Sequence, residues 1–132
     1  MTQAAKRFLI VDDDKTNNLI TKMAIKKSLS EVEIVEFIVP EAALEYIKAE
    51  YLKHPKEDKT TILLDINMPT LNGWEFLEEF DTFTESIKRQ FNIYILSSSI
   101  DLGDIQQAKV NPLVIDFIEK PLNKTVLSQI FS

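Results

Sequence analysis

The chain is poor in the residues that build many catalytic and metal sites: its 132 residues include no cysteine, 2 glycines and 1 histidine. Without cysteine it can form neither a disulfide framework nor a thiolate zinc site, and it has no thiol nucleophile. The lone histidine, His54, lies in a polar stretch, so we expect neither a serine–histidine triad nor a multi-histidine metal site. The low glycine content also excludes a collagen-like or low-complexity chain.

Long hydrophobic runs and an excess of positive charge are absent as well. No apolar run approaches the roughly 18 residues of a membrane span, and the first run is too short for a signal peptide. We therefore expect a cytoplasmic protein with no membrane partner. The 15 basic and 21 acidic residues give a net charge of −6, which argues against direct binding to nucleic acid.

A single domain over residues 1–132 is the expected organisation, because domains usually have about 100–200 residues. Hydrophobic residues make up 45% of the chain and charged residues 27%, which is the balance of a soluble globular protein. The polar stretch 53–60 is interpreted as a surface loop and not a domain boundary, because the same pattern of short apolar runs continues on both sides.

Short apolar runs rich in β-branched and aromatic residues predict strands over residues 8–11, 33–39, 61–64, 92–96 and 113–118. All but the second are apolar almost throughout, which is typical of strands buried on both faces of a parallel sheet. The segments between them favour helices. This alternation predicts an α/β fold built from right-handed βαβ units.

Helical signals are clearest between the third and fourth predicted strands. There, one face of a single helix is predicted from the spacing of Phe76, Phe80, Phe83 and Ile87. Asn72 with Glu75 predicts a capping box at the start of this helix. Pro40 suits the first turn of an earlier helix.

Polar residues follow four of the predicted strands, at the point where each apolar run stops. They are Asp12–Asp14 after the first strand, Asp65 after the third, Ser97–Ser99 after the fourth and Lys120 after the fifth. Ligands bind at the carboxyl ends of the strands in an open parallel sheet, so these groups should meet at one edge. Taken singly, Asp14 could equally be a helix cap and Lys120 a surface lysine.

Together these groups predict a particular chemistry. Several carboxylates at one site repel one another unless a hard cation lies between them, and oxygen-only ligands suit Mg²⁺. A carboxylate can also attack phosphorus to form an aspartyl phosphate. The Lys120 ammonium would then neutralise phosphoryl charge, and the Ser97 hydroxyl would donate to a phosphoryl oxygen.

At these motifs the chain resembles the receiver domain of two-component response regulators, of the single-domain kind. The matching segments are residues 9–14, 64–69 with Asn72-Gly73 following, 95–98 and 117–121. The resemblance implies a flavodoxin-like, doubly wound (βα)5 fold whose five-stranded parallel sheet has the order 2-1-3-4-5. The loop 53–60 is longer than is usual and is similar to that of receivers that work with photoreceptor-type histidine kinases.

The resemblance also implies roles for individual residues. Asp65 would be the phosphoacceptor. Asp13, Asp65 and the backbone carbonyl of Asn67 would bind Mg²⁺, with Mn²⁺ as a substitute, and Asp12 would act through a metal-bound water. Lys120 would contact the phosphoryl group.

Further roles concern the response to phosphorylation. The resemblance implies that Ser97 is the switch hydroxyl, in place of the commoner threonine, and that Phe117 is the switch aromatic without a tyrosine hydroxyl. Asn67 and Ser99 would tune dephosphorylation. The bond between Lys120 and Pro121 is expected to be cis.

By the same resemblance, a histidine kinase or histidine phosphotransfer protein would donate the phosphoryl group. The output would be a protein–protein contact with an unidentified downstream protein, because one closing helix after Pro121 leaves no room for a DNA-binding output domain. We expect no conventional turnover enzyme. The chain would catalyse only its own phosphorylation and dephosphorylation, and its oligomeric state is left open.

Two other hypotheses stay open at this point. Asp12–Thr16 also fits the DxDx(T/V) nucleophile motif of haloacid-dehalogenase-type phosphatases, in which Asp12 would be the nucleophile. Those enzymes need a further acidic pair after their lysine, and residues 122–132 contain none. Alternatively, the chain could be a degenerate receiver that binds partners without being phosphorylated.

Overall fold

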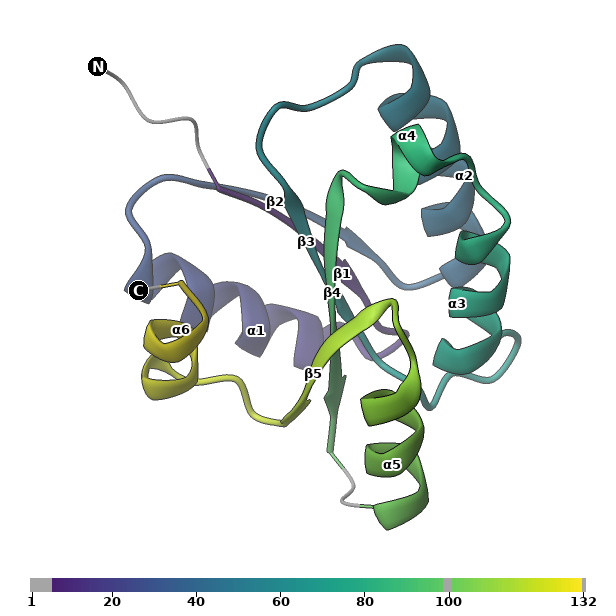
Figure 1. Ribbon diagram of the computed structural model, residues 1–132. Helices are drawn as coiled ribbons and strands as arrows, with labels where there is room; N and C mark the ends of the chain where they lie inside the picture. Colours follow the sequence, from purple (N-terminus) through teal and green to yellow (C-terminus); the bar gives the residue numbers. More distant parts are fainter. Residues whose placement is uncertain (1–5, 99–100, 132) are drawn as a thin grey trace.

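The computed structural model describes residues 6–98 and 101–131. A parallel sheet of 5 strands in the order β2-β1-β3-β4-β5 forms its centre (Figure 1). Their bounds are β1 Lys6–Val11, β2 Val32–Phe37, β3 Thr60–Leu64, β4 Phe91–Ser97 and β5 Val114–Glu119. The predicted doubly wound, flavodoxin-like fold with strand order 2-1-3-4-5 is therefore confirmed.

Helices cover both faces of the sheet, as Figure 1 shows. Their bounds are α1 Lys15–Ser28, α2 Pro40–Lys53, α3 Gly73–Asp81, α4 Glu85–Lys88, α5 Leu102–Val110 and α6 Lys124–Phe131. Helices α1 and α6 pack on one face, and α2, α3, α4 and α5 pack on the other. Over the part of the chain that the structure describes, no helix is long and apolar enough to cross a membrane.

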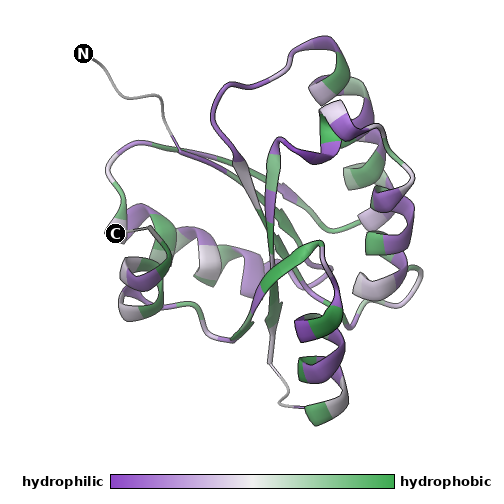
Figure 2. Cartoon of the chain, viewed as in Figure 1, coloured by the Kyte–Doolittle hydropathy of each residue, from purple (hydrophilic) through white to green (hydrophobic). Residues whose placement is uncertain are grey.

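The hydrophobic core forms two layers separated by the sheet. Every residue of β3 is buried, since this strand lies between β1 and β4 and is covered on both faces. Figure 2 shows the hydrophobic residues concentrated in the central strands, with hydrophilic residues on the outer sides of the helices. The densely packed centre of the molecule therefore carries the loops that follow β1 and β3.

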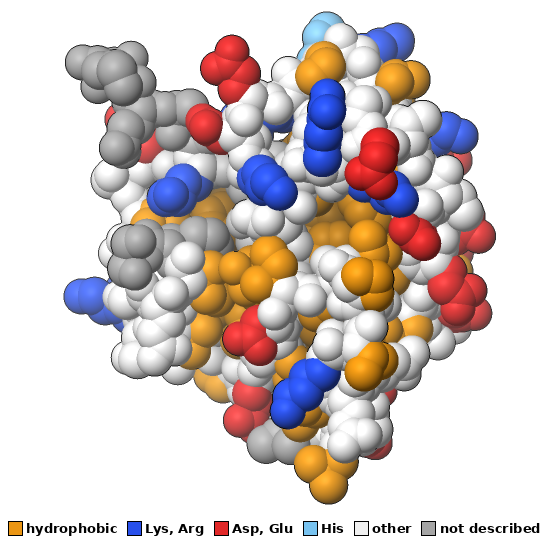
Figure 3. All heavy atoms as spheres, viewed as in Figure 1, with side chains coloured by type: hydrophobic (Ala, Val, Ile, Leu, Met, Phe, Trp, Pro, Cys, Tyr) orange, Lys and Arg blue, Asp and Glu red, His pale blue; other side chains and the backbone are white. Residues whose placement is uncertain are grey.

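Strand β5 differs from the expectation of a strand buried on both faces. It is the edge of the sheet, and Ile115 is 54% exposed. Figure 3 shows hydrophobic side chains at the surface in the middle of the side of the molecule that it presents. The apolar run predicted the strand correctly, but its exposure follows from the strand order, because an edge strand has a neighbour on one side only.

The single helix predicted over Phe76–Ile87 is wrong, because the chain forms two helices there. Helix α3 ends at Asp81, and the Thr82 hydroxyl donates a 2.6 Å hydrogen bond to the carbonyl of Glu79. Such a local hydroxyl bond competes with helix propagation. Ile87 of α4 is nevertheless buried in the same core layer as Phe80, so the apolar spacing did not reveal the break.

Helix starts agree with the sequence signals. Asn72 and Glu75 form the predicted capping box, with both reciprocal bonds at 2.9 Å. Pro40 occupies the first turn of α2. Asp14 caps α1, and its carboxylate accepts from the backbone N–H groups of Thr16 and Asn17. The capping explanation for Asp14 is therefore confirmed.

Candidate functional site

Three carboxyl groups converge where β1 and β3 end. Asp12 and Asp13 follow β1, and Asp65 follows β3; one oxygen of each lies within 4.8 Å of the others. The two strands are neighbours, and the Asp65 N–H continues their ladder with a 2.9 Å bond to the carbonyl of Val11. Asp12 and Asp65 are buried, while Asp13 is exposed. The site is thus formed by the parallel pairing of the central strands.

Lys120 brings a positive charge to this cluster from the end of β5. Its Nζ lies 2.6 Å from Asp12 Oδ2 and 3.8 Å from Asp65 Oδ1, and its side chain is only 9% exposed. The Lys120 N–H donates to the carbonyl of Ser97 at 2.8 Å. The peptide bond to Pro121 is cis, as predicted. Lys120 is therefore a buried member of the acidic cluster and not a surface lysine.

Burial has the largest effect on the pKa of the Asp65 carboxyl group. The pKa of Asp65 is raised from 3.8 to about 6, mainly by burial, and the neighbouring carboxylates of Asp12 and Asp13 act in the same direction. The Lys120 ammonium and the backbone N–H of Asn67, which bonds the carboxylate, act in the opposite direction on this pKa. Desolvation outweighs the attraction to Lys120 because that ammonium lies closer to Asp12.

Replacing Asp65 with Asn should therefore stabilise the fold at neutral pH when no divalent cation is present. Because the folded-state pKa is raised, the stability linked to this group is fully present below about pH 4 and lost as pH rises through about 6. We expect urea unfolding to show Asp65→Asn about 2 kcal/mol more stable than wild type at pH 7.5. The difference should shrink toward pH 4, and a pH-independent difference would contradict this cause.

The remaining predicted site residues differ in their burial. Ser97 is the last residue of β4 and is fully buried, whereas Phe117 on β5 is half-buried against the core layer beneath α2 and α5. Asn67 is exposed and lies in the loop that follows Asp65. Ser99, predicted to tune dephosphorylation, lies outside the described residues.

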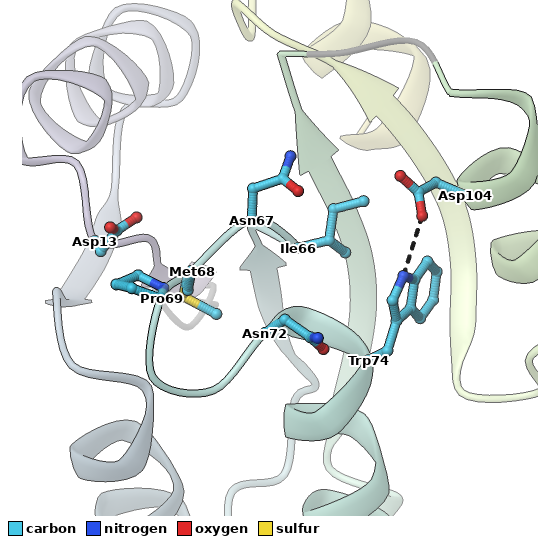
Figure 4. Close-up of a pocket in the computed structure, with 8 residues that line it drawn as sticks. All are labelled: Asp13, Ile66, Asn67, Met68, Pro69, Asn72, Trp74 and Asp104. Carbon is cyan, nitrogen blue, oxygen red and sulfur yellow. Dashed lines mark hydrogen bonds between the residues drawn. The ribbon is translucent and has the colours of Figure 1, made fainter.

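A cavity of about 610 Å³ opens beside the cluster (Figure 4). Its walls come from the end of β1, the loop after β3, and the first turns of α3 and α5. The lining residues are Asp13, Ile66, Asn67, Met68, Pro69, Asn72, Trp74 and Asp104. Asp13 is the member of the acidic cluster that lines this cavity.

Sequence analysis gave no role to two residues that position this site. Gly73 lets α3 approach the loop: an added Cβ would lie 2.6 Å from Ile66 Cγ2 and 2.9 Å from the Asp65 carbonyl oxygen. Asn18, fully buried on α1, donates through Nδ2 to the carbonyl of Asp12 at 3.0 Å. The sequence signal that could have revealed Asn18 is its helical spacing from Thr21 and Ile25, which places a polar amide on the buried face of α1.

The response regulator receiver domain family matches residues 8–132, which is almost the whole chain. The chain therefore belongs to the response regulator receiver family, and the resemblance seen in its motifs is confirmed.

Solved structures agree with this assignment. The receiver protein from Dyadobacter fermentans is 30% identical, with a TM-score of 0.82 over 96% of this chain and 94% of that one. A two-component response regulator from Cytophaga hutchinsonii is 28% identical, with a TM-score of 0.86 over 98% and 96%. The phosphorylated cyanobacterial phytochrome response regulator RcpA is 28% identical, with a TM-score of 0.70 over 96% and 89%. No curated protein matched the chain.

The donor set fits the Mg²⁺ ion that receiver domains bind at an acidic pocket. Asp12, Asp13 and Asp65 offer oxygen atoms only, which are the ligands that this hard cation takes. Their three negative charges face the single positive charge of Lys120, so a divalent cation would balance the cluster.

Proposed function

We propose that this receiver is a phosphorylation switch in which Asp65 accepts a phosphoryl group from a phosphohistidine of a kinase or phosphotransfer protein. The observation that carries the proposal is the buried Asp65 carboxylate, which lies within reach of Lys120 and beside Asp12 and Asp13. The family supports the same function.

The position of each side chain supports its proposed role. An Asp65 oxygen attacks phosphorus while the phosphorus–nitrogen bond breaks and its electron pair returns to the imidazole. Lys120 stabilises the charge on the phosphoryl oxygens. A Mg²⁺ ion held by Asp13, Asp65 and the Asn67 carbonyl, with Asp12 acting through a water, would supply further charge neutralisation.

The signal would leave the site through the ends of β4 and β5. A new phosphoryl oxygen on Asp65 attracts the Ser97 hydroxyl, and Phe117 repacks into the space that Ser97 vacates. Because Phe117 is half-buried on the edge strand, this motion changes the surface around β5 and α5. Contacts that exist only in the phosphorylated state shift the population, and a downstream protein binds the shifted form.

Phosphorylation by a small donor tests the proposal. Wild type incubated with Mg²⁺ and acetyl phosphate should gain the mass of one phosphoryl group, located on Asp65 by peptide mapping. Asp65→Asn should gain none, because the nucleophile is gone. Asp14→Asn is the matched control: it loses the same charge nearby but keeps a side chain that caps α1, so it should be phosphorylated normally.

The same measurement separates the two other hypotheses. A phosphoryl group found on Asp12, together with steady release of phosphate, would indicate the phosphatase reaction instead. No mass increase in wild type would indicate a receiver that works without phosphorylation.

An exposed apolar surface beside the site supports docking of a phosphodonor protein. Leu19 and Met23 on α1 are 54% and 56% exposed, and Ile38 after β2 is 39% exposed. Leu19 and Ile38 line one hollow together with Lys15, which directly follows the capping Asp14. A partner that covers this surface would be held next to the acidic cluster.

Placing a charge on this surface should slow transfer from a protein donor but not from acetyl phosphate. We expect Leu19→Glu to reduce the transfer rate roughly tenfold with the kinase that phosphotransfer profiling identifies, because a buried interface residue becomes charged. Leu52→Glu is the control: Leu52 is 58% exposed but lies in the last turn of α2. Equal slowing by both variants, or slowing with acetyl phosphate, would contradict this docking surface.

A further inference from the structure

One side-chain pair beside the site has no part in the function proposed above. The indole N–H of Trp74, at the start of α3, donates a 3.2 Å hydrogen bond to Asp104 Oδ1, in the first turn of α5 (Figure 4). Both residues line the cavity that contains Asp13 and Asn67. The pair joins two helices that are far apart in the sequence.

Helix α5 packs beside β5 but buries little apolar surface. Among its described residues Ala108 alone is buried, whereas α2 buries five of its residues. Its apolar side chains Leu102 and Val110 are 77% and 80% exposed. With so little apolar area buried, a single charged hydrogen bond is a substantial part of what fixes the position of α5.

The position of α5 is also linked to the proposed switch. The helix follows β4 in the chain, and β4 ends at Ser97. Asp104 faces the same cavity as Asp13, so it lies on the side of α5 that is turned toward the phosphorylation site. Phosphorylation replaces the single negative charge of the Asp65 carboxylate with about −1.5 to −2 charges on the phosphoryl group, and the added charge repels a nearby carboxylate.

Trp74 has space into which its ring can turn. On one side lies the cavity of about 610 Å³, and on the other a groove of about 330 Å³ between α3 and α5. The groove is lined by Leu77, Val110 and Leu113 among others, so it is partly apolar. Trp74 lines both spaces and is only partly buried against the core, so its ring has open volume next to it.

We propose that the Trp74–Asp104 hydrogen bond is a latch that holds α5 in its unphosphorylated position and opens when Asp65 is phosphorylated. This inference rests on the proposed function. The latch stabilises the inactive form, so it lowers the fraction of molecules in the form that reacts with a phosphodonor.

Removing either partner should increase the rate at which acetyl phosphate phosphorylates Asp65, measured by intact mass. We expect Asp104→Ala and Trp74→Phe each to accelerate the reaction roughly tenfold, the size of a lost charged hydrogen bond. Because both remove the same bond, the double variant should be no faster than either single variant. Glu78→Gln is the charge control, since Glu78 lies on α3 and lines only the far groove; it should react like wild type.

The single tryptophan of the chain gives an independent readout. Its emission should shift when wild type is phosphorylated, and Asp65→Asn treated in the same way should show no shift. Unchanged or slower phosphorylation of the latch variants, additive effects in the double variant, or an unchanged emission in phosphorylated wild type would each overturn the latch. If wild type gains no phosphoryl group at all, it is the proposed function that fails.

Discussion

The site depends on the balance of charge between three carboxyl groups and one ammonium. Oxygens of Asp12, Asp13 and Asp65 lie within 4.8 Å of one another, and Lys120 contacts the first and approaches the last. Three negative charges and one positive charge leave two negative charges, which is the charge that a single divalent cation neutralises. Burial is the main cause of the raised pKa of Asp65, and the carboxylates of Asp12 and Asp13 add to it against the opposing effect of Lys120.

The order of the strands explains how these charged groups come together. Parallel strands place all their carboxyl ends at one edge, and the order β2-β1-β3-β4-β5 puts β1 and β3 side by side in the centre. Asn18 fixes the backbone of Asp12 from one face, and Gly73 lets α3 pack close to the Asp65 loop from the other. The repelling carboxylates are thus held together, because the backbone segments that carry them cannot separate without loss of core packing.

Much of this arrangement could be predicted from the sequence, because the apolar runs locate the strands and the polar residues after them locate the site. The interruption after Asp81 could not, since Phe80 and Ile87 remain on one buried face in either case. The exposure of β5 depends on strand order, and the Trp74–Asp104 contact joins residues 30 positions apart. Local patterns do not contain such contacts; only the three-dimensional arrangement defines them.

A calorimetric titration with Mg²⁺ tests the central claim most directly. The account predicts one ion bound per chain and much weaker binding by Asp13→Asn. Binding by Asp14→Asn should be unchanged, because the Asp14 carboxylate of the wild type caps a helix and is not part of the cluster. The absence of binding to wild type, or equal weakening by the two variants, would contradict the view that these carboxylates are assembled around a divalent cation.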